Sequence, residues 1–280
     1  GKHIFSFDFE TTSTDPMQAE AVGISFSFKA KEAVYIALFN KSKCFLEPDY
    51  VFNSLKRIFE DASYKKIGQN IKYEAIILRN KGITLKGISF DTMIASYLIN
   101  PSKPNHNLGD ISIEYLNTKL TSIDELVGKG KKQLSMKEAE LDKVYRYGCQ
   151  DADITFRLSK ILAERLKKYE LEDLFYELEV PLIYVLAQME INGVKLDTKL
   201  LNKLSTEMEE KLKCLTDDIY RLSGCTFNIN SPKQLSDVLF EKLKLPTVKK
   251  TKTGYSTDVE VLKELAKTHS IAKMLLIFLS

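Results

Sequence analysis

The sequence predicts an α/β domain with a mixed sheet, followed by an almost entirely helical region. β-branched and aromatic residues recur over 2–9, 21–29 and 33–39 between turn-like breaks, which is typical of strands. Helical and strand-like segments then alternate, and from residue 171 the apolar spacing is helical almost throughout. With 280 residues and 44% hydrophobic content, the chain can bury the cores of one large or two modest domains.

The alternating region has elements with clear boundaries. Helices are expected over 51–61, 71–81, 91–99, 107–116 and 141–169, and a further strand over 65–69. Gly82 ends the second of these helices. The third ends before Pro101, because the residue before a proline avoids helical geometry.

The helical region is expected to contain four segments, 171–191, 198–223, 232–243 and 258–267. We place the domain boundary near residue 177, which gives domains 1–176 and 177–280. No glycine- and serine-rich linker is visible there, so the two domains are expected to pack together.

Composition argues against a membrane or secreted protein. The longest apolar stretch, 274–279, is far shorter than the roughly 20 residues that cross a bilayer, and no signal-peptide pattern opens the chain. The four cysteines lack C-x-x-C spacing and neighbouring histidines, which argues against zinc and for reduced thiols. We therefore expect a cytoplasmic protein. The net charge of +3 does not by itself indicate a polyanionic partner.

Two acidic residues, Asp8 and Glu10, stand one position apart at the end of the first expected strand. Side chains at i and i+2 share a face, so both carboxylates point one way while Phe7 and Phe9 point the other. Such a pair can bind a hard divalent cation, because carboxylate oxygens suit Mg²⁺ and Mn²⁺. The alternative interpretation is two solvated charges that end an edge strand.

A second pattern lies in the long helix expected over 141–169. Tyr147 and Asp151 are four residues apart, so the phenol and the carboxylate lie nearly above one another on one helix face. A phenol beside a metal-bound carboxylate can orient an attacking water. A half-buried tyrosine and a surface aspartate are the alternative interpretation.

A third segment, Asn70 to Glu74 within Gly-Gln-Asn-Ile-Lys-Tyr-Glu, decides between these interpretations. With it, the chain resembles the 3′→5′ proofreading exonuclease domain of bacterial family A DNA polymerases of the polymerase I type. The family's D-x-E, N-x-x-x-D and Y-x-x-x-D motifs correspond to Asp8–Glu10, Asn70–Glu74 and Tyr147–Asp151. Further family-like stretches cover 90–93, 106–108 and 128–134, and 189–197 and 227–235 resemble the opening of the family's polymerase domain.

This resemblance implies a ribonuclease-H-like mixed sheet flanked by helices, followed by a truncated, all-helical thumb. The exposed apolar run 274–279 is expected to continue into the palm and fingers of a longer protein. Those regions carry the nucleotide-adding site of the family. The present chain is therefore not expected to polymerise DNA.

The resemblance also implies a two-metal mechanism with Mg²⁺ or Mn²⁺. Asp8, Glu10 and Asp151 would hold the tighter ion, with Asp8 bridging to the second. Glu74 takes the place of the fourth carboxylate, and Tyr147 would align the attacking water. The remaining family-like positions near the bound strand are Asn70 and His106.

The implied partner is DNA, bound at a single-stranded or frayed 3′ end from which a monomeric enzyme releases mononucleotides. The loop 249–256, with Lys249, Lys250 and Lys252, corresponds to the tip of the thumb, which follows the duplex backbone. Lys129, Lys131 and Lys132 form a second basic cluster in a glycine-rich loop. On composition alone, most such clusters are simply solvated loops, and it is the resemblance that favours phosphate contact.

Two positions depart from the family pattern. Thr14 stands where a larger apolar residue often wedges at the terminal base, so weaker strand separation is expected. Glu74 replaces the usual aspartate and is the only support for one alternative, a catalytically degenerate domain that binds DNA or braces the polymerase. Another is a stand-alone exoribonuclease of the ribonuclease D type, which the thumb-like residues 227–235 disfavour.

Overall fold

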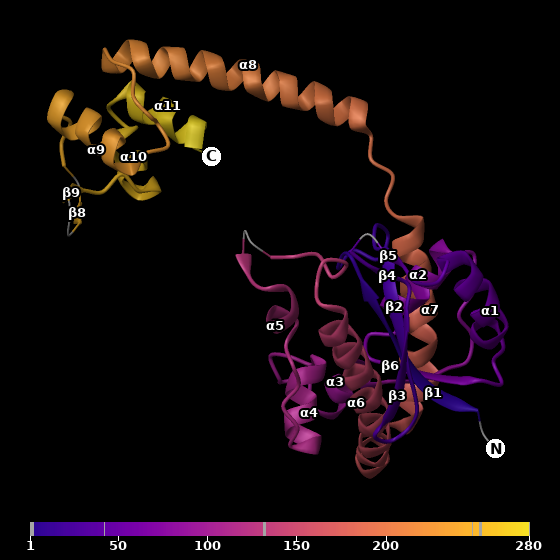
Figure 1. Cartoon of the computed structure of the whole chain (residues 1–280). Coiled ribbons are helices and arrows are strands. Elements are labelled where there is room, and N and C mark those ends of the chain that lie inside the picture. Colours follow the sequence, from indigo (N-terminus) through magenta and orange to yellow (C-terminus); the bar gives the residue numbers. More distant parts are fainter. Residues whose placement is uncertain (1–2, 42, 131–132, 248, 252–253, 280) are drawn as a thin grey trace. The chain divides into compact units, whose positions relative to one another are not determined.

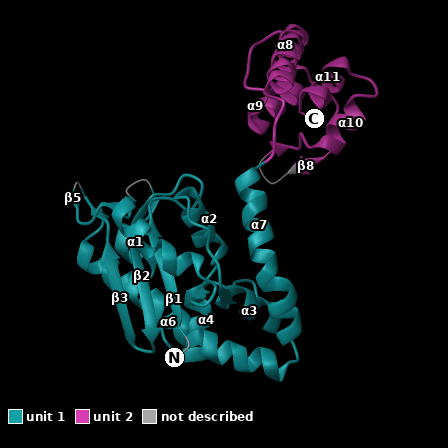
Figure 2. Cartoon of the chain, turned by 90° about the vertical axis from the view of Figure 1, so that its right-hand side faces the viewer, with its two compact units in different colours: residues 1–193 teal, residues 194–280 magenta. Residues whose placement is uncertain are grey.

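The computed structural model describes residues 3–41, 43–130, 133–247, 249–251 and 254–279. The chain forms two compact units, Gly1–Gly193 and Val194–Ser280 (Figure 2). No helix in the described ranges is long and apolar enough to span a membrane.

A mixed five-stranded sheet forms the centre of the first unit (Figure 1). Its strands, in spatial order, are β3 (Glu32–Ala37), β2 (Ala21–Lys29), β1 (Ile4–Thr11), β6 (Lys65–Gly68) and β7 (Ile88–Asp91). β1 pairs antiparallel with β2 and parallel with β6, and β6 pairs parallel with β7. The four predicted strands are confirmed. β7 was not predicted, because four residues are too few to show a strand period.

Helices cover both faces of this sheet (Figure 1). They are α1 (Pro48–Glu60), α2 (Lys72–Asn80), α3 (Thr92–Ile99), α4 (Leu108–Leu116), α5 (Ile123–Val127), α6 (Leu141–Lys168) and α7 (Val180–Asn192). A two-stranded ribbon of β4 (Phe39–Asn40) and β5 (Lys43–Cys44) precedes α1.

The two faces of β1 pack against different helices. Phe7 lies against Phe59 of α1, with ring centroids 5.0 Å apart. On the other face, the hydroxyl of Ser6 donates a hydrogen bond of 2.6 Å to the carbonyl of Ala152 in α6. Because strand side chains alternate, the acidic residues at even positions of β1 face α6, as the sequence predicts.

α7 belongs to the first unit, because it packs against α2 and β7. The boundary predicted near residue 177 therefore falls inside this unit and within the π-helical segment η2 (Leu174–Glu179) that precedes α7. Pro181 lies in the first turn of α7. Proline donates no backbone hydrogen bond, and the first turn of a helix tolerates this, so the backbone stays helical from η2 into α7.

The second unit is mainly helical. Its elements are α8 (Thr198–Ser223), α9 (Pro232–Ser236), η3 (Asp237–Lys242), the hairpin of β8 (Lys250–Thr251) and β9 (Gly254–Tyr255), α10 (Val259–Leu265) and α11 (Ser270–Leu279). Ile219, Leu239 and Leu275 are fully buried in its core. The helix α11 was not predicted, because its apolar residues form a continuous run instead of a periodic stripe.

Candidate active site

One cleft of about 850 Å³ brings together the acidic and phenolic residues that the sequence singles out. Asp8 and Glu10 reach it from β1, Glu74 from the first turn of α2, and Tyr147 and Asp151 from α6. The loop after β1, the turn before α2 and residues of the stretches 123–130 and 133–136 complete the lining. Three elements distant in sequence therefore converge on one acidic site.

Local backbone features place these side chains. The pairing of β1 with β2 shifts register between Glu10 and Thr11, which ends the regular strand just after the acidic pair. The side chain of Asp91 accepts hydrogen bonds from the amides of Ile71, Met93 and Ile94. A single buried carboxylate thus joins the end of β7 to the starts of α2 and α3, and so fixes the helix that carries the fourth acid.

The four carboxylates have raised pKa values. Burial raises the pKa of Asp8 to about 7. Burial also raises the pKa of Glu10, Glu74 and Asp151 well above the ordinary range, and the charge of Asp8 adds to the effect in each case. Among the described residues, no lysine or arginine forms an ion pair with any of the four. Among the described residues, no positively charged side chain therefore offsets the charge of these four acids.

Unpaired oxygen atoms support the fit of this site to a divalent cation. Glu10 Oε1, Glu74 Oε2 and Asp151 Oδ1 are buried and accept no hydrogen bond. Carboxylate oxygens are the donors that Mg²⁺ and Mn²⁺ prefer. Among the described residues, no three acidic, histidine or cysteine groups stand at the spacing of a formed metal site. The oxygen atoms of these acids are thus suitable ligands for a divalent cation, although the described side chains do not have the spacing of a formed metal site.

Tyr147 supports Asp151 by donating a hydrogen bond to its carboxylate, which lowers the pKa of that acid against the effect of burial. Burial, and then the charge of Asp151, raise the pKa of Tyr147 above its ordinary value. The phenol therefore keeps its proton at neutral pH and acts as a hydrogen-bond donor in the cleft.

Comparison with known proteins identifies the family. Residues 1–167 match the family model described as "3'-5' exonuclease", and residues 198–280 match that of "DNA polymerase family A". The chain belongs to the DNA polymerase A exonuclease family. Its first unit is a 3′-5′ exonuclease domain, and its second unit is a portion of a family A polymerase, as the sequence predicts.

Relatives at 36–37% identity support this assignment. The chain is 37% identical to DNA polymerase I of Pseudomonas aeruginosa over 94% of its length, and 36% identical to that of Geobacillus stearothermophilus over 96%. It spans about 30% of the length of these relatives. A solved structure, the POL domain of Pol1 from M. smegmatis in complex with DNA primer-template and dNTP, is 26% identical. It matches with a TM-score of 0.71 over 98% of this chain and 44% of that one, which confirms the predicted fold class.

The two residues predicted to lie near the bound strand, Asn70 and His106, differ in their position relative to the cleft. Asn70 lines the cleft with a left-handed backbone (φ 60°), a conformation that asparagine tolerates better than most residues. His106 is absent from the cleft lining. Its Nδ1 lies 2.9 Å from the hydroxyl of Ser96, and its carbonyl accepts a hydrogen bond from Gln69, which does line the cleft. A direct contact between His106 and a bound strand stays a prediction.

Sequence reasoning missed two residues that shape the cleft. The hydroxyl of Tyr73 lies 2.6 Å from Thr11 Oγ1 and donates to the carbonyl of Ser13 at 2.5 Å, which ties α2 to the loop after β1. Its position next to Glu74 in the motif was an available signal. Ile123 also lines the cleft, and nothing in its sequence context distinguishes it from a core residue.

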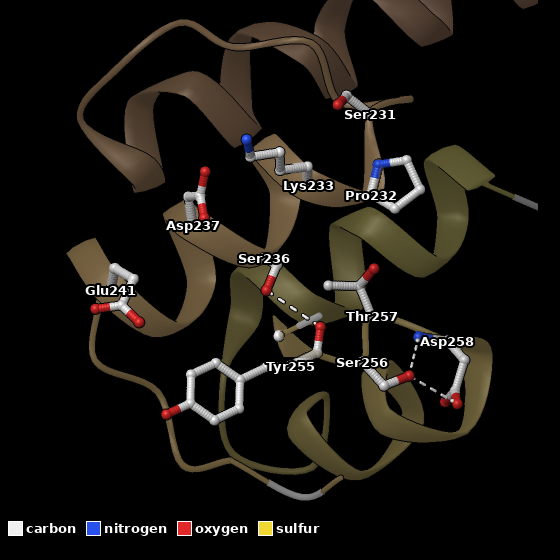
Figure 3. Close-up of a pocket in the computed structure, with 11 residues that line it drawn as sticks. Ser231, Pro232, Lys233, Ser236, Asp237, Glu241, Tyr255, Ser256, Thr257 and Asp258 are labelled. Carbon is white, nitrogen blue, oxygen red and sulfur yellow. Dashed lines mark hydrogen bonds between the residues drawn. The ribbon is translucent and has the colours of Figure 1, made fainter. Parts of the chain in front are cut away.

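The polymerase-like unit contains a larger hollow of about 1020 Å³ with different chemistry (Figure 3). Its charged lining is Lys233, Asp237, Glu241 and Asp258. Asp258 caps α10 and accepts hydrogen bonds from Ser256 and Val261. These bonds and Lys249 lower its pKa to about 2. The carboxylates of this hollow are exposed or partnered, so we assign the chemistry to the smaller cleft of the exonuclease domain.

Proposed function

We propose that the first unit hydrolyses DNA from its 3′ end, one mononucleotide at a time, with two Mg²⁺ or Mn²⁺ ions. The observation that carries this proposal is the convergence of four carboxylates with raised pKa values on one cleft, two of them buried (Glu10 and Glu74) and two half-buried (Asp8 and Asp151). Three of their oxygen atoms have no partner. The membership of the chain in an exonuclease family supports the same chemistry.

Each residue has a role that its position supports. Asp8, Glu10 and Asp151 would hold the tighter ion, and Glu74 would serve the second together with Asp8. When bound, two such ions generate a nucleophilic hydroxide and stabilise the charge on the leaving 3′ oxygen. The phenol of Tyr147 keeps its proton and is held by Asp151, so it can orient the attacking water.

The proposed substrate is a single-stranded or frayed 3′ end. A paired terminus must first be unstacked before its phosphate can enter a cleft, and a mismatch lowers that cost. The solved M. smegmatis Pol1 domain holds a DNA primer-template, which supports DNA as the partner. The monomeric state and the cytoplasmic location stay predictions.

The proposal also includes contact between duplex DNA and the lysines of the loop 249–256 in the second unit. Lys249 forms an ion pair of 2.9 Å with Asp258, so its charge is already partnered. The ammonium of Lys250 lies 5.9 Å from the centre of the Tyr255 ring. Lys252 lies outside the described residues, as do Lys131 and Lys132 of the other predicted basic cluster.

The degenerate-domain alternative depends on Glu74. Its carboxylate is 3% exposed, lies close enough to Asp8 for that charge to raise its pKa, and has one oxygen without a partner. A glutamate that had lost its role in the site would not need to keep a charge-bearing group buried at this cost. We therefore favour an active enzyme.

Release of mononucleotides from a 3′-labelled single strand tests the proposal, with Mg²⁺, with Mn²⁺ and with a chelator. We expect cleavage with either metal and none with the chelator. Unchanged cleavage in the chelator would contradict the two-metal mechanism. Strand binding without cleavage in both metals would favour the degenerate-domain alternative.

A further inference from the structure

A half-buried tyrosine with a buried hydroxyl, Tyr35, extends from β3 towards the acids of β1. In the sheet, Tyr35 is paired with Ser25 of β2, and Ser25 is paired with Asp8 of β1. Directly opposed residues of antiparallel strands share a face. Tyr35 therefore lies on the face that carries the acidic pair, although it does not line the cleft.

A glycine makes room for the phenol beside Glu10. Gly23 of β2 is the residue paired with Glu10. A Cβ atom added at Gly23 would lie 1.9 Å from the hydroxyl oxygen of Tyr35 and 2.1 Å from its Cζ. The tip of Tyr35 thus occupies the space that a side chain next to Glu10 would otherwise fill.

A second glycine, Gly148 of α6, lies beside both the carboxylate of Glu10 and the ring of Tyr35. A Cβ atom added at Gly148 would lie 3.1 Å from Glu10 Oε1 and 3.2 Å from Cδ2 and Cε2 of Tyr35. The same point of α6 therefore faces the carboxylate and the ring. Tyr35 and Glu10 are neighbours in a slot that two glycines keep open between the sheet and α6.

Each of the two neighbours has an unsatisfied polar atom. The hydroxyl of Tyr35 and Oε1 of Glu10 are both buried and have no hydrogen-bond partner. One is a donor and the other an acceptor, and a buried polar atom without a partner is costly. A small rotation of the glutamate, or one water bound between them, satisfies both atoms.

We propose that Tyr35 is a positioning residue for Glu10: its hydroxyl donates to Oε1, directly or through one water, and leaves the other oxygen to face a cation. This proposal rests on the proposed function, in which Glu10 is a metal ligand. Second-layer donors of this kind orient metal ligands, and their loss typically weakens metal binding by roughly 10- to 100-fold.

Calorimetric titration of the whole chain with Mn²⁺, without DNA, tests the proposal. We expect Tyr35→Phe to weaken Mn²⁺ binding by roughly tenfold. The melting temperature of the metal-free protein should change little, because phenylalanine keeps the ring and its packing and lacks only the hydroxyl. A purely structural tyrosine would show the opposite pattern, with lower stability and unchanged affinity, and that result would overturn the proposal.

Two further variants sharpen this test. Tyr115→Phe is the matched control, because Tyr115 is a partly buried tyrosine of the same unit outside the cleft lining, and it should leave Mn²⁺ affinity unchanged. In a Glu10→Ala background, which removes the acceptor, Tyr35→Phe should cause no additional loss. An equal loss in that background would show that Tyr35 acts through packing and overturn its assignment to Glu10. A wild type that binds no Mn²⁺ contradicts the proposed function itself, which is a separate outcome.

Discussion

The two hollows of this chain contain similar residue types in opposite electrostatic states. In the exonuclease cleft, burial raises the pKa of Asp8 to about 7, and no described lysine or arginine pairs with the four acids. In the hollow of the second unit, hydrogen bonds and Lys249 lower the pKa of Asp258 to about 2. Asp258 of the larger hollow therefore has a positively charged partner, whereas the four acids of the smaller cleft have none among the described residues.

This difference shows why size alone does not identify an active site. Asp258 stabilises its own fold, since it caps α10 and holds Lys249. The cleft acids destabilise the fold of the first unit in the absence of a cation, because they lie close to like charges and are shielded from water. A group that costs stability and remains in place is the better candidate for function.

The largest expected effect separates the two hollows directly. Asp8→Ala should reduce exonuclease turnover by about three orders of magnitude or more, because it removes a ligand shared by both ions. The fold should remain intact, as judged by circular dichroism. Release of mononucleotides from a labelled single strand with Mg²⁺ measures the loss.

The matched control is Asp258→Ala in the second unit. It removes a helix cap and should lower the melting temperature of that unit while leaving turnover on a single strand unchanged. Similar losses of turnover in the two variants would mean that the comparison between the hollows does not distinguish catalysis from structure.

A smaller effect is expected within the cleft for Tyr147→Phe. The change keeps the ring but removes the hydroxyl that donates to Asp151. Turnover should fall by roughly 100-fold, since orienting the nucleophile contributes on that scale. Affinity for a single strand, measured in Ca²⁺ by fluorescence anisotropy, should barely change. A parallel loss of affinity would assign the residue to strand binding.

Glu74→Asp should slow the enzyme by roughly tenfold, because shortening the side chain withdraws its carboxylate by about 1 Å and catalysis by positioning is sensitive to such errors. Glu74 is packed in the first turn of α2, where Asp91 and Tyr73 fix the surrounding backbone. We therefore expect the backbone to be adjusted to the longer side chain. Rates of both proteins in Mg²⁺ on one substrate decide the question, and a faster variant would favour the degenerate-domain alternative.

Much of the fold and the site could be predicted because each depends on local signals. Alternation in β1 correctly placed Phe7 and the acidic pair on opposite faces, and helical spacing placed Tyr147 with Asp151. These relations need only the period of one element. The family motifs then linked β1, α2 and α6, which no local period connects.

Other features depend on contacts between distant segments and left no local trace. β7 is visible only through its pairing with β6, and the extent of the first unit follows from the packing of α7 on α2. Tyr35 alternates like any strand residue, and its position beside Glu10 becomes apparent only when Gly23 and Gly148 are seen to surround it. The sequence contains these glycines, but it does not show that they face each other.

The smallest expected effect is a pH dependence of opposite sign in the two hollows. The pKa of Asp8 is about 7 in the folded protein and 3.8 ordinarily. Ionisation of Asp8 therefore lowers the stability of the metal-free protein as the pH rises from 3.8 to about 7. Asp8→Asn mimics the protonated acid. In a chelator, its melting temperature should therefore exceed that of the wild type by a margin that grows from about pH 4 to about pH 7 and then levels off. Asp258 has a lowered pKa, so its contribution is present above pH 3.8 and lost as pH falls towards 2. Asp258→Asn should therefore melt below the wild type at neutral pH and converge with it in acid, and a margin of the same sign in both variants would contradict the assignment of the two hollows.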